Sequence, residues 1–322
     1  MIQQGYQMDF TKQNFGVILY GAPGVGKTTA ALSDGANGAK TLLLDLERGI
    51  GRTKPVHRMS ASVLTAANYE EVLEGLDSPE AQQAETIVID TCGALVDYLK
   101  DWAMRTKSDA KLKSGGFNSM KGYGHVKTEI ESVTNRIKNV MHKNVVYIFH
   151  SDEKTDKDGN PIQRLRCEGS FRNTVWTGID FGGYIQMIGP NRVVSFSPTE
   201  EFFAKGCHGI EGNVPLPTLK AGQSNNFLAN LFATARANMK AEQDELGPQM
   251  SQYEETMKLV RDIVEQVSDE KTATDAATVI PTLDHALTSK AEASALLKEK
   301  TTTLGLKWSS KSKAYVQVGD QA

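Results

Sequence analysis

The sequence has little cysteine, and its cysteines are not arranged as structural cross-links. Only three occur in 322 residues, Cys92, Cys167 and Cys207, and they lie far apart without C-x-x-C spacing. An odd number of scattered cysteines argues against a disulfide framework, and the missing paired spacing argues against a zinc finger. We therefore expect a protein of the reducing cytoplasm.

Long apolar runs are also missing. No stretch approaches the roughly 20 apolar residues that a membrane helix needs. The first ten residues, MIQQGYQMDF, lack the basic start and the apolar core of a signal peptide. We expect no membrane partner, and a chain that stays in the compartment where it is made.

There is no excess of positive charge. The 36 lysines and arginines are offset by 39 acidic residues, which gives a formal net charge of −3. This balance excludes a polybasic protein, so any nucleic-acid site must be local. Apolar residues make up 39% and charged residues 23% of the chain, values typical of a folded protein that can bury a sizeable core.

The sequence does contain a series of short β-branched apolar runs between about residues 15 and 205. FGVILY, TLLLDL, TIVID and NVVYIF alternate with helical or loop stretches, a pattern typical of βα units and a parallel sheet. The runs are apolar throughout, as expected for central strands covered on both faces. Further on, GGYIQMI and RVVSFSP flank Gly-Pro-Asn and predict an antiparallel hairpin. The predicted fold class is α/β, a mainly parallel sheet flanked by helices with a late hairpin.

A change of composition near residue 238 predicts a domain boundary. We expect a core at 1–238 and a small, mostly helical unit at 239–322, joined by the polar stretch KAEQDELGPQ as a linker. Apolar residues at three- and four-residue spacings from Tyr253 to Val267 predict a helix. Ser289 and Glu292 fit a capping box that opens another helix. The final LGLKWSSKSKAYVQV predicts a short hairpin.

The most specific motif is a complete phosphate-binding loop. GAPGVGKT matches G-x-x-x-x-G-K-[ST] and lies between an apolar strand and a helix-like stretch. Glycines let backbone N–H groups surround the phosphates, Lys27 bridges the β and γ oxygens, and Thr28 binds Mg²⁺. We therefore predict ATP and Mg²⁺ as ligands. The predicted nucleotide-binding residues are Gly21, Ala22, Pro23, Gly24, Val25, Gly26, Lys27, Thr28 and Thr29.

An acidic residue ends the strand TIVID. Asp90 would lie at the carboxyl edge of the sheet beside the phosphate loop, where a carboxylate can support the Mg²⁺ ion together with Thr28. The alternative is an ordinary aspartate that caps the next helix. The phosphate loop upstream favours the metal role.

Three further residues give the sequence a resemblance to the RecA-like recombination ATPases. Asp45 and Glu47 follow the strand TLLLDL as D-x-E, the element that carries the catalytic glutamate of that family, and Glu47 matches this glutamate. TIVIDTCGAL is similar to the Walker B strand, and VVYIFHS to the strand that ends at the γ-phosphate sensor. His150 stands at the sensor position, where RecA has glutamine. The alternative for Glu47 is a solvated loop carboxylate near Arg48.

The resemblance covers about residues 15–210 and is greatest to phage-encoded RecA-like ATPases that act as nucleotide-binding or single-strand annealing recombination proteins. It implies an ATPase in the host cytoplasm that binds single-stranded DNA and forms a homo-oligomer, a filament or a ring, with ATP between subunits. A recombination protein or single-strand-binding protein is a further possible partner.

Two segments correspond to the DNA-facing loops of that family. The first, 103–127, has six basic residues and one acid, with glycines for flexibility and two interleaved aromatic rings, as backbone neutralisation and base stacking require. The alternative is a mobile lid over the nucleotide. The candidate DNA contacts of this segment are Arg105, Lys107, Lys111, Lys113, Phe117, Lys121, Tyr123 and Lys127.

The second segment follows the sensor strand. Asp158-Gly159-Asn160-Pro161 predicts a hairpin turn, and Arg164 and Arg166 on the returning arm are further candidate DNA contacts. The spacing of Asp156, Asp158 and Asn160 imitates the start of a Ca²⁺ loop, but the sixth-position glycine and the distal glutamate are missing. We expect no metal there.

A cation supplied in trans is also implied by the resemblance. EFFAKGCHG is similar to the K-x-R-x-G element that reaches the ATP of a neighbouring subunit, with Lys205 and Gly209 matching and Cys207 in the arginine position. Lys205 alone would then act on the γ-phosphate, which implies slow hydrolysis. The alternative is a surface lysine at a strand end.

The sequence therefore predicts an ATP-dependent single-stranded DNA-binding protein of recombination or annealing. Two other functions stay open. One is a motor or helicase loader that acts on a protein partner, and the other is a small-molecule kinase, for which the lysine- and glycine-rich segment 103–127 is poorly suited. Lysines around Trp308 and Tyr315 could form a DNA or protein surface, or a solvated hairpin.

Overall fold

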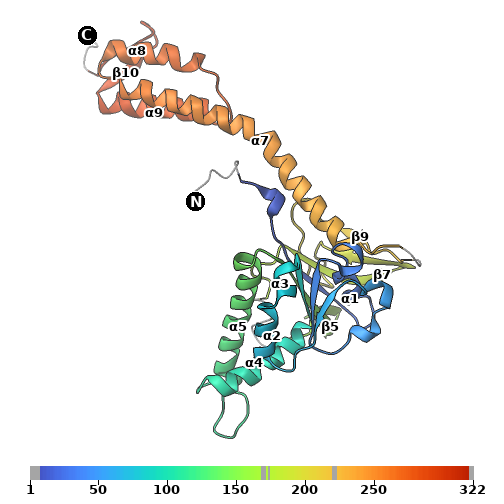
Figure 1. Ribbon diagram of the computed structural model, residues 1–322. Helices are drawn as coiled ribbons and strands as arrows, with labels where there is room; N and C mark the ends of the chain where they lie inside the picture. Colours follow the sequence, from blue (N-terminus) through green and yellow to red (C-terminus); the bar gives the residue numbers. More distant parts are fainter. Residues whose placement is uncertain (1–7, 168–171, 173–174, 220–222, 319–322) are drawn as a thin grey trace. The chain divides into compact units, whose positions relative to one another are not determined.

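A computed structural model describes residues 8–167, 172, 175–219 and 223–318 of the chain. The residues form two compact units (Figure 1). The larger unit spans Thr11–Asn238, and the smaller one contains the described residues of 239–322 and of the first ten positions. Each unit has its own hydrophobic core.

The larger unit is built on one nine-stranded sheet. Its strands are β1 (Gly16–Gly21), β2 (Thr41–Asp45), β3 (Ser62–Leu64), β4 (Thr86–Asp90), β5 (Asn144–Thr155), β6 (Pro161–Leu165), β7 (Phe181–Ile188), β8 (Asn191–Ser195) and β9 (Asn213–Pro215). The spatial order is β3-β2-β4-β5-β1-β7-β8-β9, and β6 pairs with the end of β5. The pairs from β3 to β7 are parallel, and those of β8 with its neighbours are antiparallel. The predicted α/β sheet with a late hairpin is confirmed.

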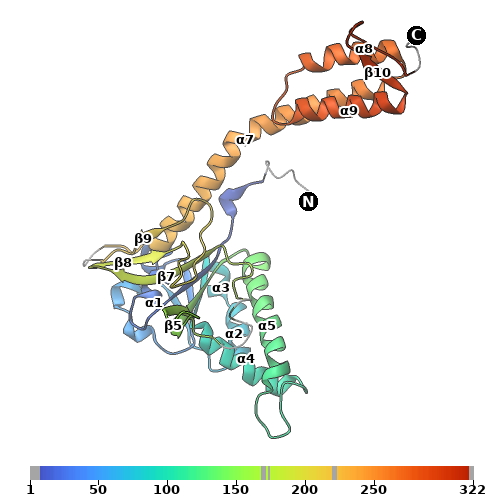
Figure 2. The same ribbon diagram turned by 180° about the vertical axis from the view of Figure 1, so that it is seen from behind.

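Helices cover both faces of this sheet because its central strands are apolar on both sides. Alternate residues such as Ile18 and Tyr20, or Ile87 and Ile89, contribute to one core cluster with the helices that lie along the same flank in Figures 1 and 2. On the other face, Phe15 stacks on Phe232 at a centroid distance of 5.4 Å. The helices of this unit are α1 (Lys27–Ala31), α2 (Tyr69–Leu76), α3 (Pro79–Gln83), α4 (Cys92–Thr106) and α5 (Ser119–Asn135), followed by the first part of α7 (Phe227–Glu265).

The parallel strands bring their carboxyl ends to one edge of the sheet. Gly21 at the end of β1 pairs with His150 of β5, and Asp45 at the end of β2 pairs with Asp90 at the end of β4. Residues that are far apart in the sequence therefore meet at this edge, which is the usual position of ligand sites in such sheets.

The smaller unit consists of helices and one hairpin. Val260 of α7 packs with Ala273, Leu297 and Leu306 in its core. Its remaining elements are α8 (Glu270–Val279), α9 (Ser289–Thr303), β10 (Leu306–Ser309) and β11 (Ala314–Gln317). The predicted terminal hairpin is confirmed. Within the described ranges, no helix is both long enough and apolar enough to cross a membrane.

The stretch KAEQDELGPQ, expected to be a linker, is helical and forms part of α7, which continues through Pro248. The capping box predicted for this region is wrong. Ser289 is the first helical residue and not the cap. Its buried hydroxyl accepts a hydrogen bond from the Ala286 N–H (3.1 Å) and contacts His285, so contacts with the preceding loop replace the predicted capping box.

Candidate nucleotide-binding site

The phosphate loop connects β1 to α1 as predicted. Gly24 and Gly26 have φ angles of +77° and +98°, which L side chains rarely adopt, so the loop conformation depends on glycine there. Lys27 Nζ donates to the carbonyl oxygens of Gly21 (3.0 Å) and Ala22 (2.9 Å). Burial lowers the pKa of Lys27, and the nearby carboxylates of Asp90 and Glu47 oppose this shift.

Thr28 and Asp90 form the predicted pair beside the loop. The Thr28 hydroxyl donates to Asp90 Oδ2 at 2.6 Å. Burial raises the pKa of Asp90 to about 6, and the hydrogen bond from Thr28 partly offsets that effect. A hydroxyl and a carboxylate are hard oxygen ligands, which suit Mg²⁺. In the described part of the chain, no cluster of three or more His, Cys, Asp or Glu residues could hold a metal, so phosphate oxygens and water would complete the coordination.

Asp45 stabilises the loop that follows β2. Its carboxylate is buried and accepts hydrogen bonds from the backbone N–H groups of Gly49 (2.7 Å) and Ile50 (2.9 Å). Both of its oxygens therefore hold the turn in place. Asp45 positions the segment that carries Glu47, and of these two carboxylates Glu47 is the one exposed in the pocket.

Glu47 and His150 form a linked set with Lys27. Glu47 Oε1 accepts a hydrogen bond from the Thr91 hydroxyl at 2.5 Å, and Glu47 Oε2 lies 3.6 Å from His150 Nε2. His150 Nδ1 lies 3.3 Å from Lys27 Nζ. Because the ammonium can only donate, Nδ1 accepts and the ring proton is on Nε2, facing Glu47. Burial, followed by the charge of Lys27, lowers the pKa of His150, which favours the neutral ring.

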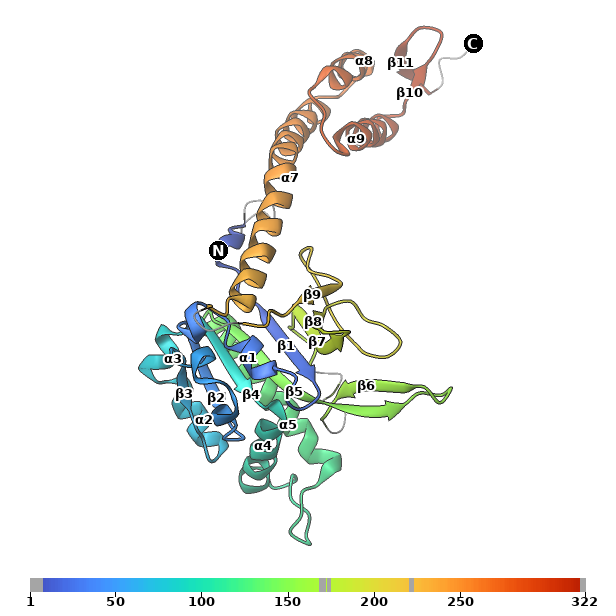
Figure 3. The ribbon, with the colours of Figure 1, turned by 90° about the vertical axis from the view of Figure 1, so that its right-hand side faces the viewer.

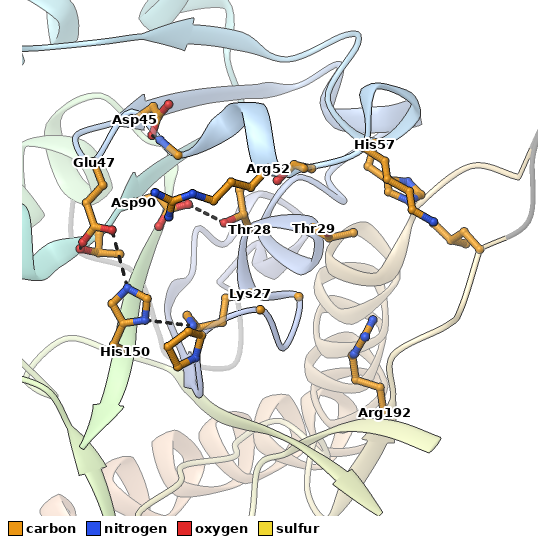
Figure 4. Close-up of a pocket in the computed structure, with 18 of the residues that line it drawn as sticks. Lys27, Thr28, Thr29, Asp45, Glu47, Arg52, His57, Asp90, His150 and Arg192 are labelled. Atoms are coloured by element: carbon orange, nitrogen blue, oxygen red, sulfur yellow. Dashed lines mark hydrogen bonds and ion pairs between the residues drawn. The ribbon is translucent and has the colours of Figure 1, made fainter. Parts of the chain in front are cut away.

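These residues line one pocket of about 410 Å³ (Figure 4). Its wall includes Gly24, Gly26, Lys27, Thr28, Thr29, Asp90, Glu47 and His150 of the predicted set. It also includes four basic residues that no motif indicated: Arg52, Lys54, His57 and Arg192. The first three follow the D-x-E element closely in the sequence, so this cluster of basic residues could have indicated an anion-binding wall of the pocket. Arg192 begins β8, far along the chain, and no local pattern marks it.

The first predicted DNA segment is more ordered than expected. Only residues 107–118 form a connection, because α4 extends to Thr106 and α5 begins at Ser119. The prediction of exposed stacking rings is wrong: Phe117 and Tyr123 are half-buried and pack edge to face at 5.2 Å. Gly122 lies inside α5 and allows this packing, since a Cβ there would be 2.4 Å from the Phe117 ring.

Several of the basic residues of this segment already have contacts within the chain. Arg105 forms an ion pair with Glu70 at 2.9 Å, and Lys107 lies over the Trp102 ring. Lys127 lies 4.0 Å from Glu131. The exposed cations in or beside the connection are Lys111, Lys113 and Lys121. A DNA role would rest mainly on these three.

The second predicted segment forms an arm of β5 and β6 that extends from the sheet (Figure 3). The Asp156 side chain accepts from the N–H groups of Asp158 and Asn160, which closes the predicted turn. Arg164 is held by the carbonyl oxygens of Gln163 (2.9 Å) and Glu201 (3.3 Å). Arg166 is exposed.

A second pocket of about 780 Å³ adjoins the first. Both pockets are lined by Glu47, Thr91 and His150. The basic side chains of the second pocket are Lys100, Lys154, Arg166 and Arg172, and its further acids are Asp97 and Asp152. Lys100 and Lys154 pair with Asp97 (3.3 Å) and Asp152 (3.7 Å), so the residues expected to act on the γ-phosphate separate a nucleotide-sized pocket from one of mixed charge.

Lys205 does not line the nucleotide pocket of its own chain. Its ammonium donates to the Ile179 carbonyl oxygen at 2.5 Å, and Cys207 Sγ lies 3.2 Å from the backbone carbonyl oxygen of Asp180. The backbone of Lys205 pairs with Gly182 of β7.

The family profile described as an AAA domain matches residues 13–208, more than half of the chain. Among curated proteins, none matches in sequence. Solved structures with similarity include a KaiC-like protein, PH0186, of Pyrococcus horikoshii OT3, with 14% identity, a TM-score of 0.35, and coverage of 64% of this chain and 90% of that one. An ATP synthase subunit, NeqB, of Nanoarchaeum equitans has 12% identity and a TM-score of 0.35, with coverage of 92% and 72%. An ATPase of the type III secretion system of pathogenic bacteria has 10% identity and a TM-score of 0.33, with coverage of 53% and 51%.

Proposed function

Since the chain belongs to the AAA domain family of P-loop ATPases, we propose that it couples ATP hydrolysis to the binding of single-stranded DNA, in recombination or annealing. The observation that carries the proposal is the wall shared by the two pockets. Glu47 and His150 face the nucleotide pocket on one side, and on the other a pocket that contains the arginines Arg166 and Arg172. A polyanion that contacts the exposed Arg166 would change the electrostatic environment of His150, which is how DNA would be coupled to the nucleotide site.

The chemistry follows from the contacts of Glu47. Its carboxylate is oriented by Thr91 and faces the protonated Nε2 of His150, and a third of its side-chain surface is accessible. It can therefore accept a proton from a water molecule aligned with the γ-phosphate. Lys27 neutralises phosphate charge, and Thr28 and Asp90 would hold Mg²⁺. The bound ion would shield the charge that develops on the phosphate oxygens.

We further propose that the protein acts as a homo-oligomer. Lys205 does not line the nucleotide pocket of its own chain, and the K-x-R-x-G resemblance places this lysine on the ATP of a neighbouring subunit. Supply of a cation in trans would make hydrolysis dependent on assembly on the DNA strand. A filament and a ring both satisfy this requirement.

The test is steady-state ATP hydrolysis with and without a single-stranded oligonucleotide, across a salt titration. Wild type is compared with Lys27→Ala, with Arg166→Ala, and with Lys290→Ala as a surface control in the smaller unit. We expect DNA to stimulate hydrolysis, salt to weaken the stimulation, Lys27→Ala to abolish all hydrolysis, and Arg166→Ala to remove only the stimulation. Hydrolysis that is indifferent to DNA at every salt concentration would overturn the coupling.

One observation favours a second candidate, a loader or motor ATPase that acts on a protein partner. The rings and several cations of segment 103–127 are engaged within the chain and are not presented for base stacking. Under this alternative, hydrolysis would respond to a protein partner and the purified chain would show no salt-sensitive affinity for single strands.

A further inference from the structure

Arg192 is a pocket residue whose position is fixed by the late hairpin. It is the second residue of β8, opposite Met187 of β7. Its carbonyl oxygen accepts a hydrogen bond from the Leu216 N–H at 2.9 Å, so the backbone is held on both sides. The side chain extends from this fixed point into the pocket (Figure 4).

The guanidinium of Arg192 has no partner among the residues that the structure describes. Its Nε atom is buried without an acceptor. No ion pair or aromatic ring within the described ranges contacts the group either. A buried, unpaired guanidinium N–H is costly, and such groups are normally satisfied by an acceptor. An anion held in the pocket would supply that acceptor.

The guanidinium lies directly against the phosphate loop. A Cβ atom built on Gly26 would be 3.3 Å from Arg192 Nη1 and 3.5 Å from Cζ. Gly26 precedes Lys27 in the loop whose N–H groups surround the phosphates. In Figure 4, Arg192 lies on the side of Lys27 away from Glu47 and His150. The position is therefore suited to the phosphates nearer the nucleoside, not to the attacking water.

We propose that Arg192 binds the α- and β-phosphates of the nucleotide from within the same chain. Guanidinium groups bind phosphate oxygens through paired, charge-assisted hydrogen bonds. This inference rests on the proposed nucleotide site, and it adds a binding residue that the phosphate-loop motif does not contain. It also supplies an arginine in cis in a chain that has Cys207 where the resemblance places one in trans.

The proposed contact has a defined kinetic consequence. The α- and β-phosphates are present in both ADP and ATP and change little during γ-phosphate transfer. Arg192 would therefore bind the ground state and the transition state equally. Its removal should raise KM and leave kcat nearly unchanged. The contact would also be independent of the base, in contrast to a guanidinium stacked on adenine.

The experiment measures the Kd values of ADP, ATP and inorganic tripolyphosphate by calorimetry with Mg²⁺ present. The variants are Arg192→Ala, Arg192→Lys and, as a control for the loss of an exposed arginine, Arg261→Ala. We expect Arg192→Ala to weaken binding of all three ligands by about 10- to 100-fold, and kcat to change less than threefold. Arg192→Lys should recover part of the affinity and Arg261→Ala should have no effect. If Arg192→Ala does not fold, the affinity of Arg192→Lys tests the proposal, since lysine should bind all three ligands more weakly than arginine does.

Two results would overturn the proposal. Unchanged tripolyphosphate affinity with weakened nucleotide affinity would place the guanidinium on the base. Unchanged affinity for every ligand would leave it without a role in binding. The proposed DNA coupling can fail independently, because it would show as hydrolysis indifferent to DNA while nucleotide and tripolyphosphate binding by the wild type stay intact. Failure of the nucleotide site itself would show as a wild type that binds none of the three ligands.

Discussion

Replacing Asp90 by asparagine should make the protein more stable while it removes a magnesium ligand. Burial is the main cause that raises the pKa of Asp90 from 3.8 to about 6. The folded state therefore disfavours the charged carboxylate relative to the unfolded state. At 1.36 kcal/mol per pKa unit, this difference corresponds to a cost of about 3 kcal/mol when the carboxylate is ionised. Asparagine removes the charge and keeps an oxygen that can accept the hydrogen bond from Thr28.

The stabilisation expected from Asp90→Asn depends on pH. A raised carboxyl pKa means that the folded protein binds the proton more tightly than the unfolded chain does. The free-energy cost of burying the ionised carboxylate is therefore complete above pH 6 and disappears as the pH falls toward 3.8. We expect Asp90→Asn to stabilise the metal-free protein by about 3 kcal/mol at pH 8 and by about half of that at pH 5. For the larger unit, about 3 kcal/mol corresponds to a rise in Tm of about 6–12 °C.

The assay is thermal unfolding in EDTA at pH 8 and pH 5, with Asp45→Asn as the matched control on the adjacent strand. Both oxygens of Asp45 accept backbone N–H groups, so its replacement should lower stability, by about 1–3 kcal/mol. Asp90→Asn should at the same time lose Mg²⁺-dependent hydrolysis. A destabilised Asp90→Asn at pH 8, or an equal effect at both pH values, would refute the burial argument.

Three further outcomes are expected. Glu47→Gln should lower kcat for ATP hydrolysis by about 100-fold or more while the Kd for ATP stays within about threefold, since the amide cannot accept the proton; equal losses in both would contradict the assignment. Gly26→Ala should lower Tm and weaken ATP binding, because φ is +98° and the new methyl group would meet Arg192, and calorimetry with thermal unfolding measures both. Leu297→Ala should destabilise the core of the smaller unit by about 2–4 kcal/mol, observed as earlier urea unfolding with basal hydrolysis unchanged.

Local sequence was sufficient for the elements whose physics is local. The apolar runs predicted the central strands, because strands buried on both faces require apolar residues throughout. Gly24, Gly26 and Lys27 predicted the phosphate loop, since this conformation depends on residue types at fixed spacing. The hairpin turn at Asp156–Asn160 was similarly determined by side chains that bond to their own backbone.

The sequence was less informative where a residue type suits more than one conformation and side-chain packing selects between them. The helical conformation of the polar stretch after Asn238 was not predicted, because polarity alone does not separate an exposed helix from a coil. Gly122 was predicted to give flexibility, but its missing side chain allows Phe117 to pack on a helix. Ser289 was predicted as a cap, and a buried contact with His285 changed its role.

For this protein, the sequence by itself determined the strands, the phosphate loop and the residue types of the site. Tertiary structure alone decided which of these residues meet. The pairing of β1 with β5 brings His150 beside Lys27, and the pairing of β2 with β4 leaves Asp45 on a turn and Asp90 beside Thr28. Arg192 reaches the phosphate loop only because β7 and β8 extend the sheet next to β1. Strand order arises from packing between segments far apart in the sequence, from 45 residues for β2 and β4 to 164 for β1 and β7, so local spacing does not encode these contacts.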